Sequence, residues 1–512
     1  MIAQRGKLGL SDSEAYALAW HKIVDANPFP AVMGRVCPHP CESGCNRAEH
    51  DGAVAVNQLE RFVGDWALAY GLSLPSLECD TKPESIGVIG AGPAGLSFAY
   101  QMARRGYPVT VYERYAKAGG MLRYGIPAYR LPEAVLDAEV QRILDLGVEL
   151  ELSTRIGREI SPEDLDSRHA LVFLGIGAHQ GRPLGIPGET GPGVWSGTDY
   201  LSQVNRGEGV SLGRRVAVIG GGDTAVDAAR AARRSGAEVT ILYRRTRAEM
   251  PAIETEVEEA AEEGIRIEYL VAPLEVLRNG ERMESLVLQR MELGAPDDSG
   301  RRRPVPLAGS EHRVGADSVI AAISQAPDWS NLEAYRLDGD PSRVDPAGRV
   351  ADRMWAGGDV LSLGIASTAI AHGRRAAEAV HARLRGLPEP ALELPDPIEA
   401  GPVKLDYYLE RPRLEPLVRP VSEWLHEPDS EIHLGITEEQ FLEEVARCLS
   451  CGQCFGCEQC WMYCAHTCFS RLDEVRPGAY FSVVLDTCQA CGKCIDVCPC
   501  GFLQIQSGEG PD

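Results

Sequence analysis

The stretch Ser85-Ile-Gly-Val-Ile-Gly-Ala-Gly-Pro-Ala-Gly-Leu96 decides the fold of the central part of the chain. A short apolar run leads into G-x-G-x-x-G and then into an alanine-rich helical pattern, with the motif glycines at Gly90, Gly92 and Gly95. These glycines permit a tight turn and let the backbone approach a pyrophosphate, which binds at the helix N-terminus. The motif alone would also fit a glycine-rich turn without a ligand.

The residues that follow favour dinucleotide binding over a plain turn. A second apolar run, Val109-Thr-Val-Tyr112, ends in Glu113, about 20 residues after the glycines. An acidic side chain at this place accepts hydrogen bonds from ribose hydroxyls. We therefore predict an α/β Rossmann-like domain whose first part is residues 83–209.

The same pattern returns in residues 210–330. Arg215-Val-Ala-Val-Ile-Gly-Gly-Gly-Asp-Thr-Ala225 starts this second unit, and Val239–Tyr243 is its second strand. Arg244 stands where the first unit has Glu113, and a guanidinium pairs bidentately with a 2′-phosphate that a carboxylate would repel. The sequence therefore predicts NADPH rather than NADH, although a solvated basic loop is the alternative. The candidate contacts are Gly220, Gly222, Asp223, Thr224, Ala225, Arg244, Arg245 and Arg247.

Residues 331–386 are expected to return to the first domain. A strand, Met354-Trp-Ala-Gly-Gly-Asp359, ends at Gly358 and Asp359, and a helix follows from about Ile365. Asp359 could bind the ribityl chain of a flavin, and the helix N-terminus near Thr368 could face the flavin ring.

The cysteines are segregated, with four of the 16 in residues 37–79 and twelve in residues 448–500. Two runs in the tail read C-x2-C-x2-C-x3-C, the pattern that wraps two [4Fe–4S] clusters in bacterial ferredoxins, where the fourth cysteine ligates the other cluster. Zinc also binds paired C-x2-C units, but it has no use for a third evenly spaced cysteine. The predicted ligand sets are Cys454, Cys457, Cys460 and Cys498 for one cluster, and Cys488, Cys491, Cys494 and Cys464 for the other.

A third iron–sulfur site is predicted in an N-terminal helical domain, residues 1–82. Cys37, Cys41 and Cys45 are broken by prolines and so do not form a helical stripe. Glu60 is the candidate oxygen ligand and Cys79 the candidate sulfur ligand; buried thiols without metal are the alternative.

Length, net charge and the distribution of apolar residues limit the class of protein. With 512 residues and a net charge of −23, the chain is expected to have several domains and to bind neither nucleic acid nor an anionic membrane. No signal peptide or membrane span is apparent, so a cytoplasmic location is expected. Residues 387–445, rich in proline and acidic residues, read as a linker before a ferredoxin-like α+β domain at residues 446–512.

Residues of about 30–385 resemble the small (β) subunit of bacterial glutamate synthase and the matching module of dihydropyrimidine dehydrogenase. The strings that carry the resemblance are Gly34-Arg-Val-Cys-Pro38, Gly90–Gly95, Gly119-Gly-Met-Leu-Arg-Tyr-Gly-Ile-Pro127, Gly220–Ala225, Tyr243-Arg-Arg245 and Gly357-Gly-Asp359. The tail resembles that of the iron–sulfur flavoprotein that partners dissimilatory sulfite reductase. Relatives carry a further four-cysteine set upstream of Cys37, which is missing here.

The resemblance implies FAD in the first fold and NADPH in the second. It adds Gly120, Met121 and Arg130 as flavin neighbours, Ile323 and Ser324 near the nicotinamide, and Glu60 as a cluster ligand. The expected activity is NAD(P)H:acceptor oxidoreduction, or its reverse, within a hetero-oligomer. The partner would be a redox protein or large catalytic subunit, of sulfite reductase, 2-oxoacid oxidoreductase or ferredoxin type.

Two other functions are alternatives to this oxidoreductase. A disulfide reductase needs a cysteine pair beside the flavin, and residues 80–447 contain no cysteine. A non-catalytic electron-wiring or scaffold subunit is the remaining alternative. Because the cofactors carry the chemistry, no catalytic acid or base is assigned.

Overall fold

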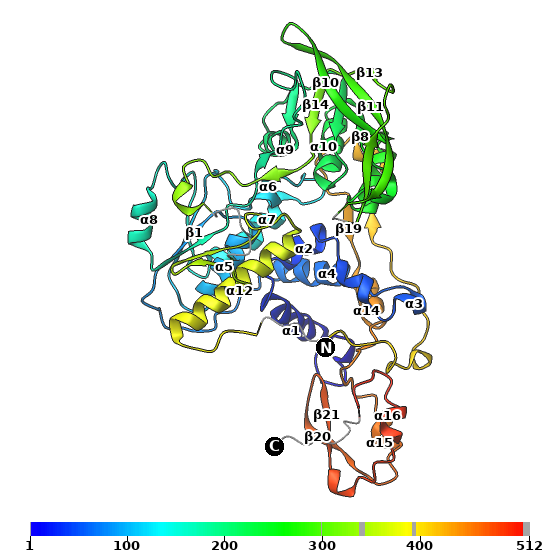
Figure 1. The fold of residues 1–512 in the computed structure, drawn as a ribbon. Coiled ribbons are helices and arrows are strands. Elements are labelled where there is room, and N and C mark those ends of the chain that lie inside the picture. Colours follow the sequence, from blue (N-terminus) through cyan, green and yellow to red (C-terminus); the bar gives the residue numbers. More distant parts are fainter. Residues whose placement is uncertain (1, 298–299, 337–343, 392–395, 505–512) are drawn as a thin grey trace. The chain divides into compact units, whose positions relative to one another are not determined.

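A computed structural model describes residues 2–297, 300–336, 344–391 and 396–504 of the chain (Figure 1). The chain forms two compact units. The first comprises residues 1–72, 391–417 and 435–512, and the second comprises residues 73–390 and 418–434. In the described part, no helix has the length and apolar character that crossing a membrane requires.

The second unit contains the first nucleotide-binding sheet, in the order β16-β17-β4-β1-β2-β3. The four-residue strands β1 and β2 are buried along their whole length and pair in parallel, with Ile86 opposite Val109, as the apolar runs predict. Helices α5 and α12 pack against each other, and Figure 1 shows them side by side. The strands are β1 (Ile86–Ile89), β2 (Val109–Tyr112), β3 (Glu149–Glu151), β4 (Leu171–Leu174), β16 (Arg349–Ala351) and β17 (Met354–Ala356); the helices are α5 (Pro93–Ala103), α6 (Met121–Tyr124), α7 (Glu133–Leu144), α8 (Pro162–Arg168) and α12 (Ala366–Arg385).

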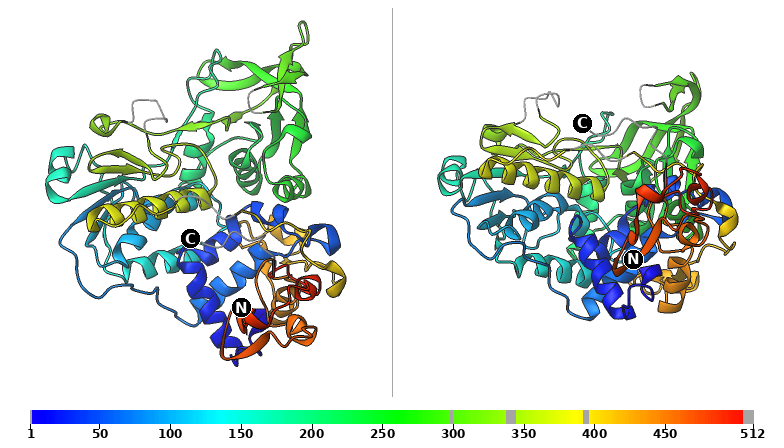
Figure 2. Two further views of the ribbon diagram at one scale, coloured as in Figure 1. Left: turned by 60° about the horizontal axis from the view of Figure 1, so that its bottom comes forward. Right: turned by 90° about the horizontal axis from the view of Figure 1, so that it is seen from below.

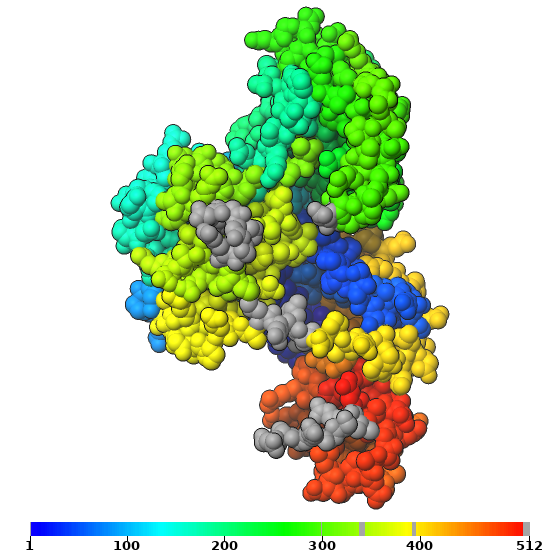
Figure 3. Space-filling model, viewed as in Figure 1, coloured from blue at the N-terminus to red at the C-terminus, as the bar shows by residue number. Residues whose placement is uncertain are grey.

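A second parallel sheet, β6-β14-β7-β8-β9, belongs to the same unit. Residues of α10 and the buried strands share one core that includes Val218, Ala228 and Ile241. An antiparallel sheet of β10, β11, β12 and β13 is inserted between β9 and β14, and this region is the green mass in Figure 3. The elements are β6 (Val194–Ser196), α9 (Gly197–Asn205), β7 (Arg215–Ile219), α10 (Asp223–Arg234), β8 (Glu238–Tyr243), α11 (Glu254–Glu262), β9 (Arg266–Tyr269), β10 (Val271–Asn279), β11 (Arg282–Pro296), β12 (Arg302–Pro306), β13 (His312–Gly315) and β14 (Ser318–Ala321), with the short pair β5 (Gln180–Gly181) and β15 (Gln325–Ala326).

The first unit joins both ends of the chain. Tyr16 of α1, Phe62 of α4 and Phe441 of α14 pack together, with the ring centroids of Phe62 and Phe441 4.0 Å apart. Figure 2 shows the blue N-terminal helices beside the orange and red C-terminal segments of this unit. Its helices are α1 (Asp12–Val24), α2 (Pro30–Val36), α3 (Ala48–Asp51), α4 (Val56–Ala69), α14 (Glu438–Val445), α15 (Gln459–Met462) and α16 (Lys493–Asp496), and its hairpin is β20 (Phe469–Arg476) with β21 (Ala479–Val483).

Residues 387–445, interpreted from composition as a linker, are divided between the two units and contain regular elements. These elements are β18 (Leu417–Val418), α13 (Val421–Trp424), β19 (His433–Gly435) and α14. Long side chains anchor the segment: the Arg413 guanidinium pairs with Glu42 and donates to the Ala53 carbonyl (2.8 Å). The proline and acid content that indicates a linker does not reveal such anchors.

Candidate functional site

A cavity lies at the carboxyl ends of β1, β2 and β4. This edge of a parallel sheet is where nucleotides bind in such folds. Seven of the predicted flavin contacts line it: Gly90, Gly92, Glu113, Gly120, Met121, Gly358 and Asp359.

The glycines leave room that any side chain would fill. Gly90 and Gly120 have φ values of +98° and +53°, which favour glycine. A Cβ on Gly120 would lie 2.7 Å from the Cα of Gly92, and a Cβ on Gly95 would lie 2.0 Å from the Gly90 carbonyl oxygen. Gly95 therefore serves the close packing of helix on strand, whereas Gly92 and Gly120 shape the cavity wall, and this wall fits a dinucleotide pyrophosphate.

Glu113 ties the glycine turn to the end of β2. Its carboxylate accepts hydrogen bonds from the backbone N–H groups of Ala91 (2.8 Å) and Tyr115 (2.9 Å). Burial raises the pKa of this carboxyl, while the two backbone donors oppose that rise. The side chain thus lines the cavity from a fixed position.

Three residues assigned to the flavin by sequence lie elsewhere. Arg130 does not line the cavity; its guanidinium pairs with Asp227 (2.7 Å) and Glu256 (2.8 Å) in a buried network. Ile365 caps α12, and neither it nor Thr368 lines the cavity, which α12 reaches through Ala369. Spacing along the chain identifies the helix but not which of its first residues faces the cavity.

Sequence reasoning missed several lining residues, which come from loops without a recognisable motif. Arg114 and Asp328 form an ion pair (3.1 Å) at the cavity. His179 also lines it, and burial, assisted by the Arg114 charge, lowers the pKa of His179 to about 4. This imidazole is therefore neutral at pH 7.

A second cavity lies at the carboxyl ends of β7, β8 and β14. Gly220 has a φ of +150°, and a Cβ there would lie 2.3 Å from the Ala322 carbonyl oxygen. The predicted contacts that line this cavity are Gly220, Gly222, Thr224, Arg244, Arg245, Ile323 and Ser324. Ala225 is instead fully buried in the core, and the Asp223 carboxylate accepts from the Ile253 N–H (2.9 Å).

The three arginines after β8 differ in their surroundings. Arg244 is exposed and lines the second cavity. Arg245 is buried, pairs with Asp297 (2.6 Å) and donates to the Arg302 carbonyl (2.7 Å). Arg247 does not line the cavity and lies 3.9 Å from Glu254. Of the three, Arg244 is the one placed for a phosphate.

The first ferredoxin set gathers around Cys498. Burial raises the pKa of Cys460 to about 12, and the neighbouring thiols of Cys457, Cys454 and Cys498 raise it further. Cys498 of the second run therefore lies near the three cysteines of the first run. The Cys498 and Cys500 sulfurs lie 3.9 Å apart.

The second ferredoxin set is more exposed to solvent, at Cys488 and Cys491. Burial raises the pKa of Cys494, and the neighbouring Cys488 and Cys491 add to this rise. Cys464 accepts a hydrogen bond from the Cys468 N–H (3.3 Å), and Cys468 in turn is a neighbour of Cys488. The predicted partners of this set therefore lie in one region.

The N-terminal cysteines have different neighbours. Burial raises the pKa of Cys41, and the neighbouring Glu42, Cys37 and Glu60 add to this rise. Cys45 is instead a neighbour of Cys451. Cys79 is exposed and belongs to the second unit.

Among the described residues, no three or more His, Cys, Asp or Glu side chains converge closely enough to hold a single metal ion. A [4Fe–4S] cube spreads its thiolates around four irons instead.

Two family models match the chain. The model "Pyridine nucleotide-disulphide oxidoreductase" matches residues 84–374, which is more than half of the chain. This chain belongs to that family. The model "Dihydroprymidine dehydrogenase domain II, 4Fe-4S cluster" matches residues 9–72. The α/β fold class with an N-terminal iron–sulfur domain is thereby confirmed, as are the predicted cofactor classes of flavin, nicotinamide nucleotide and [4Fe–4S] cluster.

Curated relatives extend the match. The chain is 37% identical to "NADPH-Fe(3+) oxidoreductase subunit beta" of Geobacter sulfurreducens, over 84% of this chain and 70% of the relative. It is 38% identical to "NADP(+)-dependent formate dehydrogenase subunit beta" of Moorella thermoacetica, over 82% of this chain and 65% of the relative. It is 36% identical to "Glutamate synthase [NADPH] small chain" of Escherichia coli K12, over 69% of this chain and 80% of the relative. The resemblance to the glutamate synthase small subunit and the assignment as an oxidoreductase are confirmed.

A solved structure shares the fold. FprA of Mycobacterium tuberculosis, in complex with NADPH, superposes with a TM-score of 0.52 at 18% identity, over 60% of this chain and 85% of FprA. At this identity the similarity shows the fold alone.

Proposed function

We propose that this chain is the electron-transferring subunit of an NADPH:acceptor oxidoreductase, with FAD in the first cavity and NADPH in the second. Oxidation of one NADPH to NADP⁺ and a proton releases two electrons. A bound flavin would accept hydride, and bound clusters would carry single electrons to a partner protein. The reverse direction, reduction of NADP⁺, uses the same parts.

The exposed Arg244 at the mouth of the second cavity carries the nucleotide assignment. Its guanidinium can pair with a 2′-phosphate, while the neighbouring glycine turn accommodates the pyrophosphate. The three relatives described above all have NADPH or NADP(+) in their names, which supports the same choice.

The protein's own groups hold the flavin in place. The glycine walls at Gly92 and Gly120 admit the pyrophosphate, and Glu113 and Asp359 offer carboxylate oxygens to hydroxyl groups. Neutral His179 and the Arg114–Asp328 pair lie in the same wall. No proton transfer by these residues is required.

The partner is proposed to be a large catalytic subunit or another redox protein, because the relatives are named as beta subunits or a small chain. Sulfite reductase-like, 2-oxoacid oxidoreductase-like and ferredoxin partners all fit this scheme.

The test is anaerobic addition of NADPH to purified protein that contains FAD. Bleaching of the flavin absorbance supports the proposed enzyme. Full flavin content without bleaching by NADPH or NADH would favour the alternative of a non-catalytic electron-wiring subunit. Stronger bleaching by NADH than by NADPH would overturn the choice of nucleotide.

A further inference from the structure

Two thiols stand just before the ferredoxin runs and belong to neither. Cys448 is exposed and Cys451 is partly buried, at C-x2-C spacing. Both lie in the first unit, as does Cys45.

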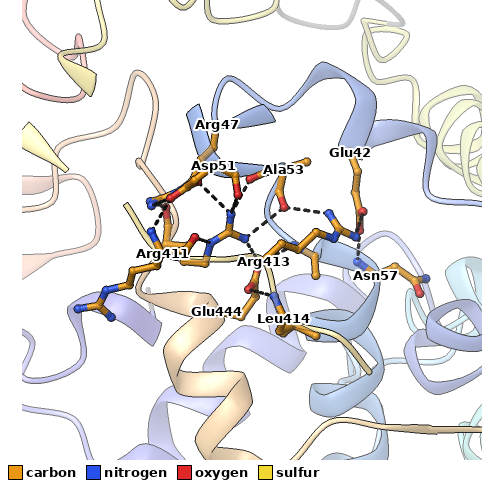
Figure 4. Close-up of polar contacts among 12 residues, drawn as sticks. Glu42, Arg47, Asp51, Ala53, Asn57, Arg411, Arg413, Leu414 and Glu444 are labelled. Carbon is orange, nitrogen blue, oxygen red and sulfur yellow. Dashed lines mark hydrogen bonds and ion pairs between the residues drawn. The ribbon is translucent and has the colours of Figure 1, made fainter. Parts of the chain in front are cut away.

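Buried arginines hold the segment before Cys448 against the loop that follows Cys45. The Arg47 guanidinium pairs with Asp51 and donates to the Arg447 carbonyl. The Arg447 guanidinium, 1% exposed as a residue, donates to the carbonyls of Gly52 (2.6 Å) and Asp51 (2.9 Å). Figure 4 shows Arg47, Asp51 and Glu444 within this network. Two stretches of chain 400 residues apart are thereby fixed side by side.

Within this junction Cys451 has both Cys45 and Cys448 as neighbours. Burial raises the pKa of Cys451, an Asn46 hydrogen bond opposes the rise, and the nearby Cys448 and Cys45 thiols add to it. Asn46, the residue after Cys45, also donates to the Ile398 carbonyl (2.9 Å). Its side chain therefore connects the N-terminal loop to the Cys451 sulfur.

The backbone between Cys448 and Cys451 repeats the turn found in the ferredoxin runs. In each of three C-x2-C turns, the residue before the second cysteine is left-handed, with φ of +54° at Ser450, +66° at Gly456 and +52° at Ala490. In the last of these, the Ala490 N–H points at the Cys488 sulfur (3.4 Å). A residue with a Cβ rarely adopts this conformation without a specific reason. The 448–451 turn therefore has the conformation of the first C-x2-C turn in each ferredoxin run.

We propose that Cys45, Cys448 and Cys451 hold a further iron–sulfur cluster, assembled from both ends of the chain. Cys45 then leaves the set formed with Cys37, Cys41 and Glu60. That set keeps two thiolates and a carboxylate, and its Cys37-Pro-His39 turn is again left-handed at His39, whose N–H contacts the Cys37 sulfur (3.4 Å). The proposal adds a site to the proposed electron chain but does not depend on NADPH oxidation.

The test measures iron and acid-labile sulfide per FAD in anaerobically reconstituted full-length protein. With four irons per cluster, the native chain should hold about sixteen rather than about twelve. Cys45→Ser and the double variant Cys448→Ser/Cys451→Ser should each lose about four irons, and the triple variant should lose no more than either. Cys37→Ser should remove a different four. Cys79→Ser is the control and should lose none.

Two outcomes would overturn the proposal. The first is native iron content in the Cys448→Ser/Cys451→Ser variant. The second is a loss in the triple variant equal to the sum of the separate losses, because the thiols would then serve different sites.

A second measurement avoids substitutions. Cys448 and Cys79 are both exposed, so an alkylating reagent should reach both in protein without iron. In protein with full iron content, Cys79 should react and Cys448 should be protected. Equal rates of alkylation at the two residues in that protein would contradict the assignment.

Discussion

The carboxylate of Glu60 accepts a hydrogen bond from the side-chain amide of Asn27 at 2.7 Å. Burial raises the pKa of Glu60 to about 7, and the hydrogen bond from Asn27 partly offsets this rise. A carboxyl held in this way lies beside Cys41, which also has Cys37 as a neighbour, so it can supply an oxygen ligand to a set that has two thiolates.

We expect Glu60→Ala to lower the occupancy of the N-terminal cluster or shift its potential, and Glu60→Gln to do so less, because the amide keeps an oxygen at the site. Iron content and the EPR spectrum of the reduced protein measure this. An unchanged spectrum and iron content in Glu60→Ala would exclude Glu60 as a ligand.

The raised pKa of Glu60 gives this site a pH dependence. Below about pH 7 the carboxyl is protonated in the cluster-free protein, and a proton must leave before an iron can bind. Reconstitution of the N-terminal cluster should therefore be weaker at pH 6 than at pH 8. In Glu60→Gln the difference in EPR signal between the two pH values should be smaller.

Arg244→Ala should weaken binding of NADPH far more than binding of NADH. A charge-assisted contact to the 2′-phosphate contributes about 1.5–3 kcal/mol, or about ten- to hundredfold in affinity. Arg247→Ala is the matched control, because Arg247 lies outside the cavity and should change either affinity little. Equal losses for the two nucleotides would place Arg244 outside the phosphate site.

Two glycine variants should separate folding from flavin binding. A Cβ at position 95 would meet the Gly90 carbonyl at 2.0 Å, so Gly95→Ala should destabilise the domain itself. A Cβ at position 92 has its nearest neighbour at 3.8 Å, so Gly92→Ala should fold yet fill part of the cavity. Thermal unfolding and FAD content check this. Full FAD occupancy in Gly92→Ala would contradict the assignment of the cavity.

Removal of the Arg447 guanidinium should detach the tail from the N-terminal helices. The side chain is buried and pairs with Glu444 and Asp51. Without it, Asp51 would keep Arg47, whereas Glu444 would keep only backbone N–H donors and would be a buried carboxylate without a cation. Loss of one partner from such a pair costs about 3–5 kcal/mol. Arg447→Ala should therefore be cleaved by protease near residue 445 much faster than the native chain. Arg411→Ala is a control, since Arg411 enters the network through its backbone N–H and carbonyl. Equal resistance of Arg447→Ala and the native chain would contradict this role.

The sequence predicts the parts of this protein that depend on local pattern. The G-x-G-x-x-G turn and the buried strand β1 follow from spacing and residue type, and the structure contains them. The role of Arg130 could not be predicted in this way, because its partner Asp227 is 97 residues away. Likewise, the neighbourhood of Cys45 and Cys451 depends on arginine contacts between the chain ends, which leave no periodic signal.

We expect electrons to leave through the clusters of the ferredoxin-like tail, and truncation is a poor test of this. A cut near residue 440 would divide α14, whose Phe441 packs on Phe62, so truncation would damage the N-terminal domain as well as the tail. Cys491→Ser removes a ligand from the exposed second ferredoxin set without cutting the chain. NADPH oxidation by an artificial dye should survive this change, whereas delivery to the physiological partner should fall. An undiminished rate to that partner would mean that electrons leave elsewhere.

The central claim is that electrons from NADPH enter at the flavin and continue to the clusters. Rapid anaerobic mixing of full-length protein with NADPH, followed by flavin absorbance and freeze-quench EPR, tests it most directly. The account predicts that flavin bleaching precedes the signals of reduced clusters, and that flavin-depleted Gly92→Ala shows neither. Cluster reduction by NADPH at the native rate in the flavin-depleted variant would contradict it.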